Sequence, residues 1–113
     1  MKRAPRRGVI YWVALDPALG TEIRKTRPAV VISNDSCNRH GSRVVVLPIT
    51  SNVGSLYPGE ARIDVRGEPG RVLGDQIRSV DKARLRSRIG TLTKQEMLNV
   101  DNAVQITLDL LPT

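Results

Sequence analysis

The sequence predicts a mainly β domain that closes with a C-terminal helix. Short apolar runs rich in Val and Ile alternate with turns over residues 9–92, and the apolar residues after Thr93 have helical spacing. A chain of 113 residues is long enough for one domain with a modest core. Strands followed by a terminal helix indicate a small, strongly bent sheet or partly open barrel with helices attached. We expect residues 1–7 to form a flexible basic tail and residues 8–113 to form this single domain.

The first two predicted strands flank a long polar loop. Residues 9–15 are apolar at almost every position, which is typical of a strand covered on both faces. The pair Asp16-Pro17 ends this strand, because proline lacks an amide donor. Residues 16–28 then form the loop, and residues 29–33 form the second strand. The Asn-Asp pair that follows favours a turn, so we expect residues 35–42 to be a loop.

The third and fourth strands differ in pattern. Residues 43–50 form an apolar strand in which Pro48 indicates an edge, a bulge or the end of the strand. After a loop over 51–60, residues 61–66 alternate between apolar and charged side chains. That alternation predicts a half-exposed strand. The sequence GEPG at 67–70 predicts a turn.

The next region predicts short elements. Residues 71–73 and 76–80 read as strand pieces interrupted by a bulge at Gly74. A short helix over 81–85 begins at an aspartate that can cap it. Residues 87–92 return as a final short strand.

The C-terminal helix has the clearest start signal. Thr93 is followed three residues later by Glu96, which is the form of a capping box, and Pro112 ends the helix after about Leu111. Apolar residues at intervals of three or four positions lie on one face: Met97, Val100, Val104, Leu108 and Leu111. The helix is therefore either a simple core helix, or one that covers the barrel with one side and meets a partner subunit with the other.

The formal net charge of +7 suggests a polyanionic partner, with nucleic acid as the first choice. A basic domain without such a partner, or one that binds an acidic subunit, is the plain alternative. The single cysteine, Cys37, forms no disulfide within the chain. No run approaches the roughly 20 apolar residues that span a bilayer. The basic N-terminus lacks the apolar core of a signal peptide, so we expect a cytoplasmic protein with no membrane partner.

The sequence lacks the residues that several common kinds of catalytic or binding site require. The single histidine, His40, follows Cys37 at a spacing that supplies too few ligands for a structural zinc site, so we expect no metal and no cofactor. Neither GxxxxGK[ST] nor GxGxxG occurs, and no serine has the nucleophile-elbow context. A mechanism that uses two histidines within one chain is impossible.

Arginines, hydroxyls and acids near strand ends remain. RNA can be cleaved without a metal when its 2′-hydroxyl attacks the adjacent phosphorus. An arginine fork suits the negative charge that develops on the phosphoryl oxygens, and a threonine hydroxyl can add a hydrogen bond. A guanidinium stays protonated, so charge stabilisation suits arginine better than proton removal. By itself, however, Arg27 is as readily a solvated loop arginine, and Thr50 an ordinary hydroxyl at a strand end.

Five segments taken in order resemble the MazF/PemK family of toxin endoribonucleases: RRGVIYWVALDP, GTEIRKTRPAVVISND, VVVLPITS, GDQIRSVDKARL and IGTLT before the closing helix. The most specific pieces are the RG pair, the G-[ST]-E block that precedes RP, and QIRS-x-D. The position after RG is often acidic in the family and is Val9 here, which we interpret as a surface difference. The resemblance covers residues 7–111.

This resemblance implies an SH3-like barrel, related to that of the CcdB-type toxins, and a homodimer. It implies sequence-specific, metal-independent cleavage of single-stranded RNA, mainly mRNA, that inhibits translation and growth. The products would carry a 2′,3′-cyclic phosphate and a 5′-hydroxyl. An acidic, MazE-like antitoxin would occupy the RNA groove. The alternative is a non-catalytic toxin-like module that binds DNA gyrase or only its antitoxin.

The same resemblance implies the site residues. Arg27, which directly precedes the proline of the RP pair, and Thr50, at the end of the third strand, would be catalytic. Glu22 would join them, either in proton transfer or by orienting Arg27 through an ion pair. The expected substrate-binding residues are Thr21, Arg24, Lys25, Ser51, Asn52, Tyr57, Gln76 and Arg78. Arg78 is equally well a structural partner of Asp81 or Asp75, whereas Tyr57, in an exposed loop, would stack on a base. Trp12 is expected in the core or at an interface.

Overall fold

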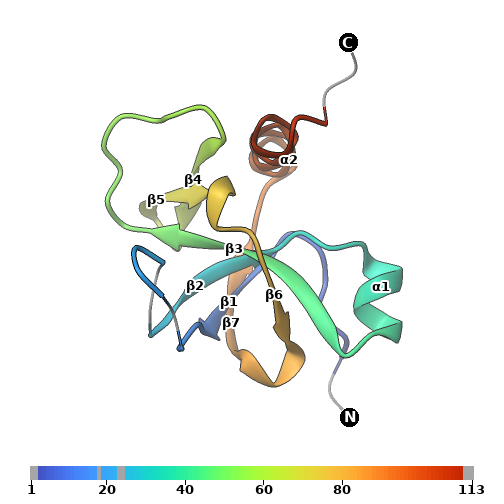
Figure 1. The fold of residues 1–113 in the computed structure, drawn as a ribbon. Coiled ribbons are helices and arrows are strands. Elements are labelled where there is room, and N and C mark those ends of the chain that lie inside the picture. The colour runs from blue at the N-terminus through green and yellow to red at the C-terminus, as the bar shows by residue number, and fades with distance from the viewer. Residues whose placement is uncertain (1–2, 18, 23–24, 111–113) are drawn as a thin grey trace.

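The computed structural model describes residues 3–17, 19–22 and 25–110, and Figure 1 shows its elements. The elements follow the chain as β1 (Val9–Ala14), β2 (Thr26–Val31), α1 (Asp35–His40), β3 (Arg43–Thr50), β4 (Glu60–Val65), β5 (Glu68–Leu73), η1 (Gly74–Gln76), β6 (Arg78–Asp81), η2 (Lys82–Arg84), β7 (Leu85–Thr91) and α2 (Lys94–Leu108). Here η denotes a short 3-10 helix. Figure 1 shows α2 beside the β4–β5 hairpin, with α1 near the start of β3. No described helix combines the length and apolar character that crossing a membrane requires.

The strands form one antiparallel, seven-stranded sheet in the order β4-β5-β3-β2-β1-β7, with β6 paired to β3. The strand β3 changes partner along its length. It pairs with β6 from Arg43 to Val46 and with β5 at Ile49 and Thr50. Pro48 lies in the gap between these two partners, where a missing amide donor costs no ladder hydrogen bond. The predicted mainly β fold with a C-terminal helix is confirmed.

Two apolar clusters lie on the two faces of the central strands. Val30 and Leu47 pack with Val100 of α2 in one cluster, whereas Val31 and Val46 pack in the other. Successive residues therefore alternate between the clusters, as the pleat of a strand requires. All four of these valine and leucine side chains from β2 and β3 are fully buried. Central strands covered on both faces explain the nearly continuous apolar runs in the sequence.

The helix α2 begins as predicted. The Thr93 hydroxyl accepts from the Glu96 N–H at 3.1 Å, and the Glu96 carboxylate accepts from the Thr93 N–H at 2.9 Å, which completes the capping box. The predicted end is wrong, because the helix stops at Leu108 and Asp109 takes a left-handed conformation with φ of 57°. The predicted last residue, Leu111, lies outside the described residues. Leu108 itself is 46% exposed.

Arg7 ties the start of β1 to both helices. Its N–H donates to the Asp35 carboxylate at 2.7 Å, and its guanidinium donates to the carbonyl of Ile32 and pairs with Asp101 of α2. The N–H of Arg7 is the first cause that holds the pKa of Asp35 below its usual value, with Asn38 contributing a further hydrogen bond. The last residue of the predicted tail is thus anchored, and the flexibility of the residues before it stays a prediction.

Several local predictions are wrong. The expected loop over 35–42 contains α1, because the Asn34 side chain accepts from the N–H groups at 36 and 37 and caps a helix rather than closing a turn. The expected turn at 67–70 is mostly strand β5, and the turn lies at Arg66 and Gly67, both with positive φ. The expected bulge at Gly74 is the 3-10 helix η1, and η2 replaces the expected short helix over 81–85.

Candidate active site

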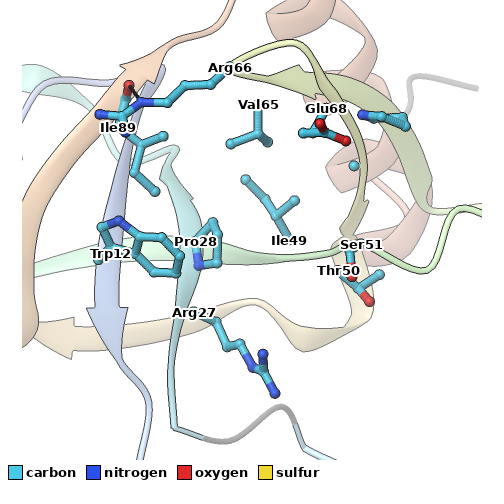
Figure 2. Close-up of a pocket in the computed structure, with 12 residues that line it drawn as sticks. Trp12, Arg27, Pro28, Ile49, Thr50, Ser51, Val65, Arg66, Glu68 and Ile89 are labelled. Atoms are coloured by element: carbon cyan, nitrogen blue, oxygen red, sulfur yellow. Dashed lines mark hydrogen bonds between the residues drawn. The ribbon is translucent and has the colours of Figure 1, made fainter.

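A pocket of about 590 Å³ lies over the apolar cluster that contains Ile49, Val65 and Ile89. It brings together residues from β1, β2, the end of β3, the β4–β5 turn and β7: Trp12, Arg27, Pro28, Ile49, Thr50, Ser51, Val65, Arg66, Glu68, Pro69, Gly70 and Ile89. Figure 2 shows Arg27 and Thr50 at one end of this pocket, with Arg66 and Ile89 at the other. We call it the Arg27–Thr50 pocket.

The register of β2 against β3 explains why Arg27 and Thr50 line the same pocket. The ladder between these strands runs from Val31↔Val46 to Ala29↔Pro48. If the same register continued by two residues, Arg27 would lie directly opposite Thr50. The pairing of β2 with β3 ends before that point, and the pocket that both side chains line lies beside it. A substrate group can therefore enter between a guanidinium and a hydroxyl.

The guanidinium of Arg27 is available to a ligand. Arg27 lies in β2, opposite Val13 of β1, and is exposed. The sequence predicted it in a loop, whereas β2 begins at Thr26. Within the described part of the chain, no carboxylate pairs with this guanidinium. Its N–H donors are therefore free to bind an anion, which a planar fork does in bidentate fashion.

The hydroxyl of Thr50 is already oriented. Its Oγ1 accepts from the N–H of Asn52 at 3.2 Å, which leaves its proton free to donate. The Asn52 side chain in turn accepts from the N–H of Gly54 at 3.4 Å. Ser51 lines the pocket beside Thr50. The end of β3 thus presents one hydroxyl with a defined acceptor role and an unused donor.

Glu22 does not line the pocket. Its carboxylate accepts from the N–H of Leu19, within its own loop, and no ion pair joins it to Arg27 among the described residues. Thr21 is exposed in the same loop. Lys25 donates its N–H to Asp16 at 2.9 Å just before β2, and its side chain is exposed outside the pocket. Arg24 was expected here and lies outside the described residues.

The remaining predicted residues lie around the pocket rather than in it. Tyr57 is 68% exposed in the loop between β3 and β4. Gln76 belongs to η1, and Arg78 belongs to β6, opposite Val46 of β3. Neither lines the Arg27–Thr50 pocket. The ion pair expected between Arg78 and an aspartate is not among those of the described residues.

Sequence reasoning named Arg27, Thr50 and Ser51 as site residues and missed the rest of the pocket lining, in which Trp12 and Arg66 are the residues best suited to contact RNA. Trp12, expected in the core or at an interface, is 39% exposed and forms a wall of the pocket. Arg66 closes the far end, where its Nε donates to the Ile89 carbonyl at 3.0 Å (Figure 2). The alternation of residues 61–66 signals an exposed arginine, but only the register of the hairpin brings it to β7. Trp12 offers an exposed aromatic surface on which a base can stack.

Across the part of the chain that the structure describes, no three His, Cys, Asp or Glu side chains gather in a way that could hold a metal ion. The expected metal independence of the reaction stays a prediction.

Comparisons with known proteins identify the family of this chain. Residues 6–108 match the sequence model of the family described as PemK-like, MazF-like toxin of type II toxin-antitoxin system. Endoribonuclease MazF9 of Mycobacterium tuberculosis (strain ATCC 25618 / H37Rv) is 38% identical over 119 residues, which cover 93% of this chain and 97% of that protein. Endoribonuclease MazF of Staphylococcus epidermidis is 34% identical over 110 residues, with 93% and 92% covered.

Solved structures share the fold. MazF from Deinococcus radiodurans superposes with a TM-score of 0.83 at 26% identity, covering 96% of this chain and 99% of that one. An endoribonuclease from a mycobacterial species, solved in complex with its cognate antitoxin, gives a TM-score of 0.82 at 25% identity, with 97% and 100% covered. These relatives confirm the predicted barrel with a C-terminal helix. The chain belongs to the family of PemK-like, MazF-like toxins of type II toxin–antitoxin systems.

Proposed function

We propose that the protein cleaves single-stranded RNA, mainly mRNA, in the Arg27–Thr50 pocket and without a metal ion. Endoribonuclease activity itself follows from membership of the family. The observation that carries the assignment of the site is that one pocket is lined by Arg27, whose guanidinium has no ion pair among the described residues, and by Thr50, whose hydroxyl accepts one N–H and can donate its proton. Both are donors, and a reacting phosphodiester supplies the acceptors.

The reaction that fits these donors is a transesterification. The 2′-oxygen of a ribose loses its proton and forms a bond to the adjacent phosphorus, while the bond from phosphorus to the 5′-oxygen breaks and that oxygen gains a proton. The products are a 2′,3′-cyclic phosphate and a 5′-hydroxyl. Arg27 and Thr50 donate to the non-bridging oxygens, where negative charge grows in the transition state. Each such donor contributes roughly 3–4 kcal/mol in measured cases.

Glu22 has two possible roles in this scheme. Its carboxylate would either take part in proton transfer or orient Arg27. Its carboxylate accepts one hydrogen bond, from the N–H of Leu19, and keeps further lone pairs for either role. The role in proton transfer predicts a pH–rate profile that changes shape in Glu22→Gln, whereas the orienting role predicts a lower rate with an unchanged profile.

Substrate contacts extend from the reacting phosphate in two directions. Trp12 offers a stacking surface inside the pocket, and Ser51 offers a hydroxyl beside Thr50. Thr21, Arg24, Lys25, Asn52, Tyr57, Gln76 and Arg78 remain proposed RNA contacts around the pocket. These side chains would read base edges of an unpaired strand, which is how most sequence-specific RNA recognition works.

The proposed partners follow from charge and from the family. The net charge of +7 suits RNA and also an acidic antitoxin segment that competes for the same groove. A mycobacterial relative was solved with its antitoxin, which supports such a partner here. We also propose a homodimer, for which the exposed apolar residues Leu98 and Ile106 of α2 are candidates. Cleavage of mRNA requires a cytoplasmic protein.

The test is cleavage of a mixed-sequence RNA pool in EDTA, with the product ends mapped. Discrete cuts that leave cyclic phosphates are expected from the wild type. Arg27→Ala and Thr50→Val should each lower the rate by about 10²–10³-fold, the usual cost of one transition-state donor. Arg27→Lys keeps the charge without the fork and should retain part of the activity. Arg43→Ala removes an exposed arginine of β3 outside the pocket and serves as the matched control.

Two outcomes would contradict the proposal. One is a wild type that cuts no RNA in a diverse pool with EDTA present, which would point to a metal requirement if added Mg²⁺ restored cutting. The other is growth inhibition that survives in Arg27→Ala, which would favour a non-catalytic toxin that binds gyrase or another target.

A further inference from the structure

A second pocket, of about 440 Å³, lies where the residues before β1 meet β1 and β7. We call it the arginine pocket, because half of its eight lining residues are arginines: Arg3, Arg6, Arg7 and Arg88. No Asp or Glu lines it. A concave site with several guanidinium groups and no carboxylate attracts anions, and phosphate is the anion that a guanidinium fork binds best.

Among the described residues, one of these arginines forms an ion pair. Arg7 pairs with Asp101 of α2. Arg3, Arg6 and Arg88 form no ion pair among the described residues. The charge of Arg6 helps to lower the pKa of Asp35, whose carboxylate also accepts from the N–H of Arg7. Among the described residues, the pocket therefore keeps the guanidinium groups of Arg3 and Arg88 for a ligand, together with an Arg6 whose charge is partly compensated.

The position of Arg88 is fixed by the fold. Its Nη2 donates to the Thr91 hydroxyl at 2.7 Å, and both residues line the pocket. Tyr11 of β1, which pairs with Arg88 across the sheet, forms part of the floor. This arginine is thus held in place before any ligand binds, which lowers the entropy that binding costs.

The two pockets lie on opposite faces of the β1–β7 pair. Trp12 and Ile89 line the Arg27–Thr50 pocket, whereas their chain neighbours Tyr11 and Arg88 line the arginine pocket. Successive residues of a strand point to opposite faces, so this division follows from the pleat. The strand β7 ends the strand order, and no strand of the described chain pairs with its outer edge. A flexible chain can pass around that edge from one pocket to the other.

We propose that the arginine pocket binds backbone phosphates of the RNA strand whose cleaved bond lies in the Arg27–Thr50 pocket. This inference rests on the proposed function, because it assigns the second pocket to the same strand. It predicts that RNA recognition has two parts. The first pocket holds the reacting phosphate, and the second adds affinity for RNA long enough to reach around β7, without regard to base sequence.

The test compares binding of two RNA lengths by fluorescence anisotropy at several salt concentrations. All proteins carry Arg27→Ala, which should slow cleavage by about 10²–10³-fold, so that little RNA is cut during the measurement. The test variant adds Arg6→Gln and Arg88→Gln, and the matched control adds Arg39→Gln and Arg43→Gln, which remove the same charge outside both pockets. The ligands are a trinucleotide that fits the first pocket alone and a single-stranded RNA of about 15 nucleotides. Inorganic phosphate serves as a competitor.

Each lost phosphate contact should lower the slope of log K against log salt by about 0.7 for a single strand. The test variant loses two arginines, and each is expected to hold one phosphate, so its slope for the long RNA should be shallower by about 1.4. A tenfold rise in salt should then weaken RNA binding by the test variant about 25-fold less than it weakens binding by the parent. Trinucleotide binding should be unchanged, which also shows that the variant is folded. The control should match its parent with both ligands. Millimolar phosphate should weaken only the long RNA.

Three results would overturn the inference. One is equal slopes for the test and control variants with the long RNA. Another is loss of binding to a poly-glutamate peptide with RNA binding intact, which would assign the pocket to an acidic protein partner. A third is a change of oligomeric state in the test variant alone, which would make the pocket an interface between copies. Because cleavage is not measured, the result stands apart from that of the EDTA assay above.

Discussion

Removing the Arg71 side chain should destabilise the protein through the loop between β3 and β4. Arg71 lies opposite Thr50 in the β3–β5 ladder. Its Nη1 donates to the Ser55 carbonyl at 3.3 Å and lies 3.7 Å from the Glu60 carboxylate. The same carboxylate accepts from the N–H of Tyr57 at 3.0 Å. Arg71 and Glu60 together hold this loop against the strand that carries the Thr50 hydroxyl.

The size of the effect follows from burial. The side chains of Arg71 and Glu60 are 16% and 13% exposed. Charges 3.7 Å apart attract by about 4 kcal/mol at an effective dielectric constant of about 20, before desolvation is counted. Removing one partner of a buried pair costs about 3–5 kcal/mol, because the other charge stays buried alone.

Two terms reduce that cost in Arg71→Met. Glu60 keeps the N–H of Tyr57 as a donor. The Nε of Arg71 is buried without a hydrogen-bond partner, and its removal recovers about 1 kcal/mol. We therefore expect Arg71→Met to lower the free energy of unfolding by about 2–3 kcal/mol. This value is the lower part of the cost of breaking a buried pair, less the free energy recovered by removing the unpaired Nε.

Urea unfolding measures the free energy of unfolding of each variant in a double-mutant cycle. The cycle comprises Arg71→Met, Glu60→Gln and the double variant, and a coupling energy above about 1 kcal/mol is expected for such a pair. Arg62→Met is the matched control, because Arg62 is exposed and donates only to the carbonyls of Val53 and Gly54. Its cost should stay near 1 kcal/mol, the usual value for such hydrogen bonds. If Arg71→Met costs no more than Arg62→Met, or if the coupling energy is close to zero, the reasoning is refuted.

Two further predictions concern other parts of the fold. Gly74→Ala should lower the free energy of unfolding by about 2–3 kcal/mol, a cost typical of overpacking, because its Cβ would lie 2.3 Å from the Gly59 carbonyl oxygen. Gly90→Ala should be nearly neutral in the same urea experiment, since nothing lies within 4 Å of a Cβ there. The pKa of Asp35 is held below 3.8, chiefly by the N–H of Arg7, so its stabilising contribution is present above pH 3.8 and is lost as pH falls through the lowered value. The melting temperature of Asp35→Asn should therefore fall less steeply than that of the wild type below pH 3.8, and parallel acid limbs would contradict this.

The sequence predicts some elements at their observed positions for a clear physical reason. The strand β3 spans Arg43–Thr50 as expected, because a run of β-branched residues is bounded on both sides by turn-forming ones. The start of α2 at Thr93 follows from local capping groups alone. Signals of this kind lie within a few residues of each other, so no knowledge of distant contacts is needed.

Other elements depend on contacts that sequence cannot supply. Asn34 suits a turn and a helix cap equally, and a short helix with little apolar surface gives no further signal. Pro69 and Gly70 suggest a turn, yet both lie in β5. At these two positions β5 pairs only with β4, so a proline is tolerated. A side chain at Gly70 would have a Cβ 2.8 Å from a methyl group of Ile49, so the close packing of β3 on β5 selects glycine there.

The candidate site also contains some residues that the sequence pointed to and others that only the fold brings there. Family resemblance pointed to Arg27, Thr50 and Ser51, and the structure brings all three into one pocket. It could not point to Trp12 or Arg66, because their place in the pocket depends on strand register and on the twist of a hairpin. Glu22 illustrates the opposite case, in which a residue implied by resemblance has its carboxylate bound to its own loop.

The proline after Arg27 has a physical reason that belongs to the site. The N–H of Ile32 donates to the Val45 carbonyl at 2.9 Å, so even-numbered residues of β2 direct their N–H groups toward β3. Pro28 stands in this series without an N–H, and the ladder between the strands ends at Ala29. A residue with an N–H at position 28 would add a donor directed toward β3, so we expect it to extend the ladder and to narrow the space between Arg27 and Thr50. The Arg-Pro pair therefore supplies the guanidinium and withholds the donor that would extend the pairing beside it.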